Sequence, residues 1–93
     1  MKYSIDRPPL SEKFSLPTRE ELLKLVPGNL VKLIFRSNTG EVERMWVSIT
    51  TQQDSSEWSG LLDNDPFSES LKEISSDEVI KFHPLDVIQI WEE

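Results

Sequence analysis

The fold of this chain is decided by residues 30–50, "LVKLIFRSNTGEVERMWVSIT". The first part of this stretch is rich in β-branched and aromatic residues, which favour strands. Its last part alternates between apolar and polar residues, as a strand with one buried face does. The turn-forming residues "SNTG", 37–40, lie between the two parts. We therefore predict a β-hairpin with strands at 30–36 and 41–50. The apolar face of its second strand consists of Met45, Val47 and Ile49.

Three more short strands are expected after the hairpin. They are predicted at 57–63, 78–82 and 87–91. Gly60 in the first of them indicates a bulge or a close approach of two backbones. Turn signals recur about every eight to twelve residues, which favours an antiparallel meander that curls into a small barrel. The tight turn "HPLD", 83–86, just before a short last strand is similar to that part of SH3-like barrels.

The one clear helical signal is "TREELLKLVPG", residues 18–28. Thr18 followed by Glu21 is the pattern of an N-terminal capping box, and Pro27-Gly28 ends the helix. The apolar stripe of this helix consists of Leu22, Leu25 and Val26. A helix this short is marginal alone, so we expect the stripe to pack on the sheet.

The predicted chain organisation has two parts. Residues 1–17 contain three prolines and are predicted to form an extended arm. Residues 18–93 are predicted to form a single α+β domain. Its expected architecture is a small curled antiparallel sheet or an SH3-like barrel of about five strands, with one short N-terminal helix packed on it.

The 93-residue chain has a formal net charge of −7. Residues 1–40 carry seven basic and four acidic side chains, and residues 41–93 carry three and thirteen. This charge disfavours a nucleic-acid partner, and it can either keep the protein soluble or attract a basic partner. The absence of cysteine excludes disulfides and thiolate ligands. No segment has the pattern of a membrane span or a secretory signal, so we expect a cytoplasmic protein that binds no membrane.

The segment "LDNDP", 62–66, allows three interpretations. Asp63 and Asp65 have the alternating spacing of a calcium loop, but no third oxygen ligand follows at the required spacing. In a small metal-dependent hydrolase these carboxylates would act with His83 and Asp86, although no nucleophile accompanies them. The simplest interpretation is a turn that ends a strand. We therefore expect no catalytic residue, no metal ligand and no cofactor.

The tryptophans are the main candidates for a binding surface. Strand alternation places Trp46 and Trp91 on the face opposite the predicted core. Exposed tryptophans flanked by acids can bind a protein, although the helix and the arm could instead cover them. No basic patch is interleaved with these rings, which disfavours stacking of nucleic-acid bases. The predicted contact surface combines the tryptophans with an acidic rim: Trp46, Trp58, Trp91, Asp63, Asp65, Glu41 and Glu43.

Three motifs follow one another in the second part of the chain: "ERMWV" at 43–47, "LDNDP" at 62–66 and "DEVIKFHPLDVIQIW" at 77–91. Together they resemble a bacterial family of small domains of unknown function, the YegJ-like proteins, over roughly residues 30–91. Ser76 stands where that family often has glycine. The resemblance implies a fold of the kind predicted above, and it implies no known activity.

Three functions are compatible with these observations. The first is a non-enzymatic bacterial protein-interaction module, for example an immunity or inhibitor protein that masks a basic partner. The second is the small metal-dependent hydrolase described above. The third is a nucleic-acid-binding barrel, with a basic face made of Lys32, Arg36, Arg44 and Lys81. The acidic composition favours the first.

Overall fold

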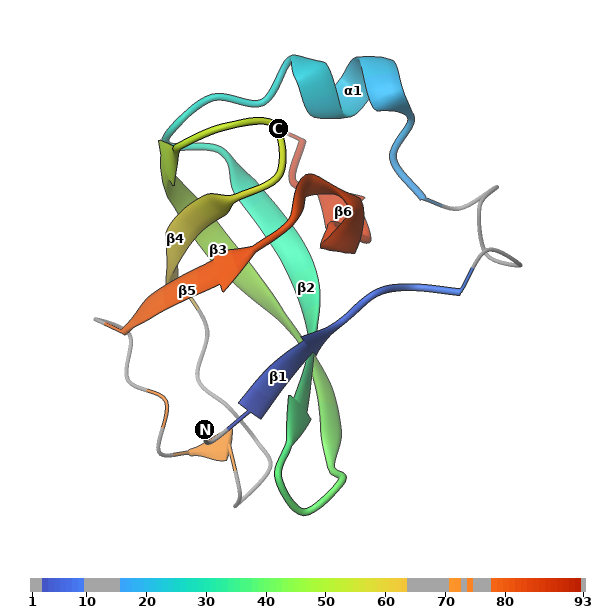
Figure 1. Ribbon diagram of the computed structural model, residues 1–93, viewed down its shortest axis with the longest axis vertical. Helices are drawn as coiled ribbons and strands as arrows, with labels where there is room; N and C mark the ends of the chain where they lie inside the picture. The colour runs from blue at the N-terminus through green and yellow to red at the C-terminus, as the bar shows by residue number, and fades with distance from the viewer. Residues whose placement is uncertain (1–2, 10–15, 64–70, 73, 75–77, 93) are drawn as a thin grey trace.

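The protein is a curled antiparallel sheet with little helix (Figure 1). The computed structural model describes residues 3–9, 16–63, 71–72, 74 and 78–92. The strands are β1 (Tyr3–Asp6), β2 (Leu30–Ser37), β3 (Val42–Gln52), β4 (Trp58–Leu62), β5 (Val79–Phe82) and β6 (Gln89–Ile90). The helical elements whose bounds the structure describes are α1 (Arg19–Leu23) and a 3₁₀ turn, η3 (Pro84–Asp86).

Strand β2 is bonded along both of its edges. Strands β1 to β5 pair in chain order, each antiparallel to the next. The edge of β2 that does not face β3 is shared, because β1 pairs with residues 34–37 and β6 pairs with residues 31–32. The sheet therefore curls around β2 into a half-barrel, with the two ends of the chain on one edge of the same strand.

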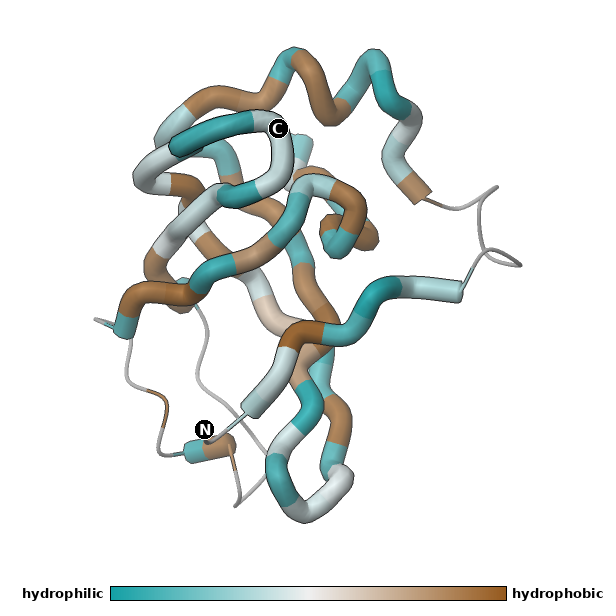
Figure 2. The backbone as a smooth tube through the Cα atoms, in the orientation of Figure 1, coloured by the Kyte–Doolittle hydropathy of each residue, from teal (hydrophilic) through white to brown (hydrophobic). Residues whose placement is uncertain are grey.

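The predicted hairpin is confirmed. In the β2–β3 register Val31 lies opposite Val47 and Leu33 lies opposite Met45. The predicted apolar face of β3 is buried, since Met45, Val47 and Ile49 are at most 1% exposed. Figure 2 shows the change between apolar and polar residues along the strands. The apolar face of this hairpin, together with β4 and β5, encloses the core.

The predicted helix is much shorter than expected. Helix α1 has five residues, although its capping box between Thr18 and Glu21 is present. Pro27 disfavours the helical region for the residue before it, and Val26 is 54% exposed. Only Leu22 and Leu25 of the apolar stripe join the core. An α+β domain with a helix packed on the sheet is therefore not confirmed, and the architecture is mostly β.

Part of the segment predicted as an extended arm belongs to the sheet. Tyr3–Asp6 forms β1, and Tyr3 and Ile5 pack against the core. The ring of Tyr3 lies 5.5 Å from the ring of Phe35, measured between centroids. Asp6 accepts a hydrogen bond of 2.7 Å from the Arg36 guanidinium, which raises the pKa of Arg36. Apolar contact and an ion pair thus fix β1 on β2.

Gly60 lies where the backbones of β3 and β4 come close together, as predicted. A Cβ atom at this position would lie 2.6 Å from Cγ1 of Val47 and would also meet the carbonyl oxygen of Ser48. The β3–β4 register shifts between Ile49 and Thr51, which marks a bulge in β3. Both the close approach and the bulge sharpen the curl of the sheet.

The first prediction concerns this close approach. Gly60→Ala should destabilise the protein by about 2 kcal/mol, because the new methyl group meets a backbone carbonyl that cannot rotate away. Urea denaturation followed by circular dichroism measures the change. The control is Thr51→Ala, an exposed change on the neighbouring strand, which should alter stability by less than about 1 kcal/mol. Equal stability of wild type and Gly60→Ala would contradict the close approach.

Candidate functional site

A row of four residues crosses the outer face of the sheet. Lys32 of β2 pairs with Trp46 of β3 on one side and with Gln89 of β6 on the other. The N–H of Asp63 donates a 2.9 Å hydrogen bond to the carbonyl oxygen of Trp46. The row therefore extends over four adjacent strand positions, and neighbouring positions lie about 4.8 Å apart. Because Met45 faces the core, Trp46 faces outward.

Trp46, Trp91 and Lys32 form a contiguous surface that we call the aromatic platform. The two indole rings meet edge to face, with their centroids 5.4 Å apart and an interplanar angle of 85°. The Nζ of Lys32 lies 4.9 Å from the centroid of the Trp46 ring. Such a cation–π contact contributes about 0.5–1 kcal/mol at an exposed site. Trp91 remains 55% exposed and Trp46 is half-buried, so the platform offers apolar area to a partner.

Strand alternation and one backbone hydrogen bond bring these rings together. Alternation along β3 directs Trp46 outward, and the N–H of Trp91 donates a 3.0 Å hydrogen bond to the carbonyl oxygen of Leu30. Strand β6 thereby carries Trp91 to the edge of β2, within one strand of Trp46. The sequence predicts the outward direction of both rings, but their contact follows from the pairing of β6 with β2.

Trp58 lies away from the platform. It is 8% exposed and meets the ring of Phe82 edge to face at 6.2 Å. Its indole N–H donates a 3.0 Å hydrogen bond to the carbonyl oxygen of Asp54. Hydrogen bonds from Ser56, first from its backbone N–H, and then from Glu57 hold the pKa of the Asp54 carboxyl below its usual value. Burial therefore removes Trp58 from the contact surface, and its alternation with Gly60 and the core residue Leu62 could have indicated this.

The acidic rim is brought together only in part. Asp63 is exposed and adjoins Trp46, whereas Glu41 and Glu43 lie at the far end of the β2–β3 hairpin. Glu43 pairs with Phe35, about three residues or 10 Å along β3 from Trp46. Asp65 lies outside the described residues.

The residues of the predicted basic face are also only partly gathered. Lys32 and Arg44 lie on the outer face of the hairpin, where Arg44 pairs with Ile34 and Lys32 pairs with Trp46. Arg36 is tied to Asp6, and Lys81 lies on β5. One basic residue lies next to these rings, because Lys32 reaches Trp46 across the strands. Sequence order does not reveal this cross-strand neighbour.

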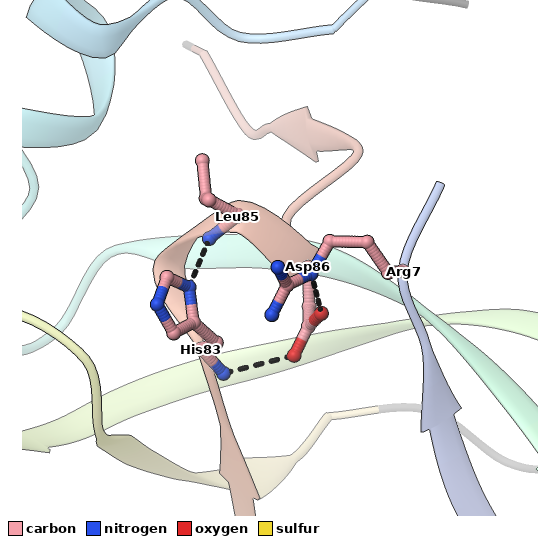
Figure 3. A network of polar contacts seen from close by, with 4 residues as sticks. All are labelled: Arg7, His83, Leu85 and Asp86. Carbon is pink, nitrogen blue, oxygen red and sulfur yellow. Dashed lines mark hydrogen bonds and ion pairs between the residues drawn. The ribbon is translucent and has the colours of Figure 1, made fainter. Parts of the chain in front are cut away.

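His83 and Asp86 build the 3₁₀ turn (Figure 3). Asp86 accepts hydrogen bonds of 2.8 Å from Nε of Arg7 and 2.9 Å from the N–H of His83. The Nδ1 atom of His83 accepts a 2.9 Å hydrogen bond from the N–H of Leu85. In the part of the chain that the structure describes, no three His, Asp or Glu side chains are grouped as a metal site would require. The described members of the hypothetical hydrolase site thus have structural contacts of their own.

No protein-family model, curated protein or solved structure matches this chain. The resemblance to the YegJ-like proteins therefore stays a prediction that rests on the three motifs. Among the described residues, no helix combines the length and the apolar character needed to cross a membrane.

The second prediction tests the structural role of Asp86. Its side chain is 10% exposed and that of Arg7 is 54% exposed. Asp86→Ala should lower the free energy of unfolding by about 2 kcal/mol, because it leaves a backbone N–H and a guanidinium without their acceptor. Arg7→Ala, which removes the exposed partner, should lower it by about 0.5 kcal/mol. Urea denaturation measures both, and an Asp86→Ala loss no greater than that of Arg7→Ala would contradict this assignment.

The third prediction separates the buried tryptophan from the platform. Trp58→Ala should destabilise the protein by about 3–5 kcal/mol through loss of core packing. Trp91→Ala should destabilise it by about 1 kcal/mol, which corresponds to one exposed aromatic pair. Thermal and urea denaturation of both variants checks the contrast. Similar losses for the two variants would show that Trp91 is a packing residue and would remove it from the binding surface.

Proposed function

We propose that this chain is a non-enzymatic protein-interaction module of the bacterial cytoplasm, and that the aromatic platform contacts its partner. The observation that carries this proposal is the exposure of Trp91 in direct contact with Trp46. Tryptophans supply a large share of binding energy at protein interfaces. The platform lies on paired strands, so its rings are held in place before binding, which lowers the entropy lost on association.

We further propose that the sheet is of the SH3-like barrel type. Strands β2 to β5 form a meander, the tight turn η3 precedes a short last strand, and that strand returns to β2. This order supports the similarity to SH3-like barrels noted for the "HPLD" turn.

The proposed partner is a basic protein, as for an immunity-type or inhibitor-type module. The charges at the platform are mixed, because it contains Lys32, and both Arg44 and Asp63 lie close to Trp46. Attraction of a basic partner would therefore come from the net charge of −7 of the whole chain, which acts over a longer range than single contacts. Under this proposal charge raises the association rate, and the tryptophans supply the affinity.

A second candidate, binding of single-stranded nucleic acid, is favoured by one observation. Lys32 lies over the ring of Trp46, and Arg44 is on the same outer face. Cations next to an exposed aromatic ring are a common arrangement for base stacking and phosphate contact. The net negative charge opposes it.

The fourth prediction tests the platform as a binding surface. Immobilised wild-type protein in a bacterial lysate should retain a basic partner, and Trp91→Ala should weaken that partner's affinity about thirtyfold, as expected for a central interface tryptophan. Asp63→Lys should slow association and reduce its dependence on salt. Surface plasmon resonance with the purified partner measures both effects.

The matched control for this experiment is Leu85→Ala, which removes another exposed apolar side chain, 54% exposed, from η3. It should leave binding unchanged. A set of retained proteins that is identical for wild type and Trp91→Ala would reject the platform. Salt-sensitive binding of a labelled oligothymidylate, lost in Lys32→Ala, would instead favour the second candidate.

A further inference from the structure

The sheet is open between its first and fifth strands. A groove of about 620 Å³ lies there, with Tyr3, Ser4 and Ile5 of β1 on one side and Val79 and Lys81 of β5 on the other. We call this groove the seam. Figure 1 shows β1 and β5 on the near side of the molecule, pointing in the same general direction. The volume of the seam is within the range of ligand-binding clefts, about 300–1,000 Å³.

Strand directions determine what the seam can accommodate. Each neighbouring pair from β1 to β5 is antiparallel, so β1, β3 and β5 all run in one direction. Direct pairing of β1 with β5 would be parallel, unlike every other pair in this sheet. A single strand inserted between them would run antiparallel to both, which is the more stable arrangement. The topology therefore defines the direction in which an additional strand in the seam would run.

On the two edges that face the seam, the described part of the chain supplies no further strand. Within the described residues, β1 bonds only to β2 and β5 bonds only to β4. Unpaired edges of this kind are templates for another strand. An extended segment of about four residues, roughly 13 Å long, would match the length of either strand.

The lining of the seam is mostly apolar, and its charged residues are Glu78, Lys81 and Asp86. Tyr3 and Ile5 are half-buried against the core, and Val79 is 55% exposed. Burial, with a smaller contribution from Glu78, raises the pKa of Tyr3. At one end Asp86 is neutralised by Arg7. Lys81 is exposed and has no ion pair or hydrogen bond among the residues that the structure describes.

We propose that the seam binds an extended segment of a partner protein by strand addition. The segment runs antiparallel to both β1 and β5, directs apolar side chains toward Tyr3 and Ile5 on the core-facing side, and carries an acidic side chain opposite Lys81 on the outer side. Backbone hydrogen bonds supply the affinity, and the carboxylate supplies the selectivity. The seam is separate from the aromatic platform, which lies on β2, β3 and β6. Binding at the seam and binding at the platform can therefore be tested independently.

The fifth prediction tests strand addition with the full chain and the acetylated, amidated peptide Thr-Val-Glu-Val-Thr-Val. Titration of isotopically labelled protein should shift the amide signals of Tyr3–Asp6 and Val79–Phe82 and slow hydrogen exchange at their outward amides. The ring signals of Tyr3, the one tyrosine of the chain, report on the seam without any mutation. The same peptide with lysine in place of glutamate should bind roughly threefold more weakly, as expected for one exposed ion pair.

Two variants make the test specific. Lys81→Glu should reverse the preference, so that the lysine peptide binds more tightly than the glutamate peptide. Lys24→Glu, which makes the same charge change at an exposed residue after α1, should leave the preference unchanged. A peptide with proline at its central positions should not bind, because it lacks the N–H donors.

Three outcomes would overturn the proposal. The first is the absence of shifts at the seam at millimolar concentrations of peptide. The second is slow exchange of every amide of β1 and β5 in the free protein, because the seam would then already be filled. The third is a concentration-dependent dimer that protects the same amides, because the occupant would then be a second copy. Peptide-induced shifts confined to Trp46 and Trp91 belong to the first outcome, and they leave the platform proposal intact.

Discussion

The structure depends on the pairing of β2 along both of its edges. On one edge, β3 supplies the hairpin partner whose buried face provides the centre of the core. On the other edge, β1 and β6 share the strand end to end. The first and the last strand thus both have to pair with β2 during folding. The contacts that they form are long-range in sequence, and they define how the sheet curls.

Both candidate surfaces follow from this shared edge. Because β6 occupies the first part of β2, Trp91 reaches Trp46 on the outer face. Because β1 occupies the remaining part, the sheet ends at β1 and the opening toward β5 remains. The bond between Arg7 and Asp86 then holds the turn that precedes β6 against the segment that follows β1. Apolar burial gives the sheet its stability, and this polar link fixes the position of the η3 turn.

The sequence predicts most of what is local in this fold. Alternation at Met45, Val47 and Ile49 fixes the buried face of β3, and a lone glycine in a strand indicates the close approach at Gly60. The length of α1 is not predictable in this way, because a helix this short depends on its packing more than on its own sequence. The pairing of β1 is also hidden, because prolines near a short apolar segment are equally typical of a loose arm. The candidate site is predicted as separate tryptophans, and only the strand order shows that Trp46 and Trp91 touch while Trp58 is buried.

An open edge is a hazard for a small β protein, and the residues at the seam bear on how this hazard is limited. Val79 favours pairing because it adds apolar area at an unpaired edge. Lys81, two residues away on the same face of β5, opposes pairing between copies, because two such edges would bring like charges to neighbouring positions. The same lysine does not oppose a strand that carries a carboxylate. A single exposed charge can therefore disfavour self-association and still permit binding of a partner with the opposite charge. Specific interfaces combine favourable contacts to one partner with unfavourable contacts to others in this way.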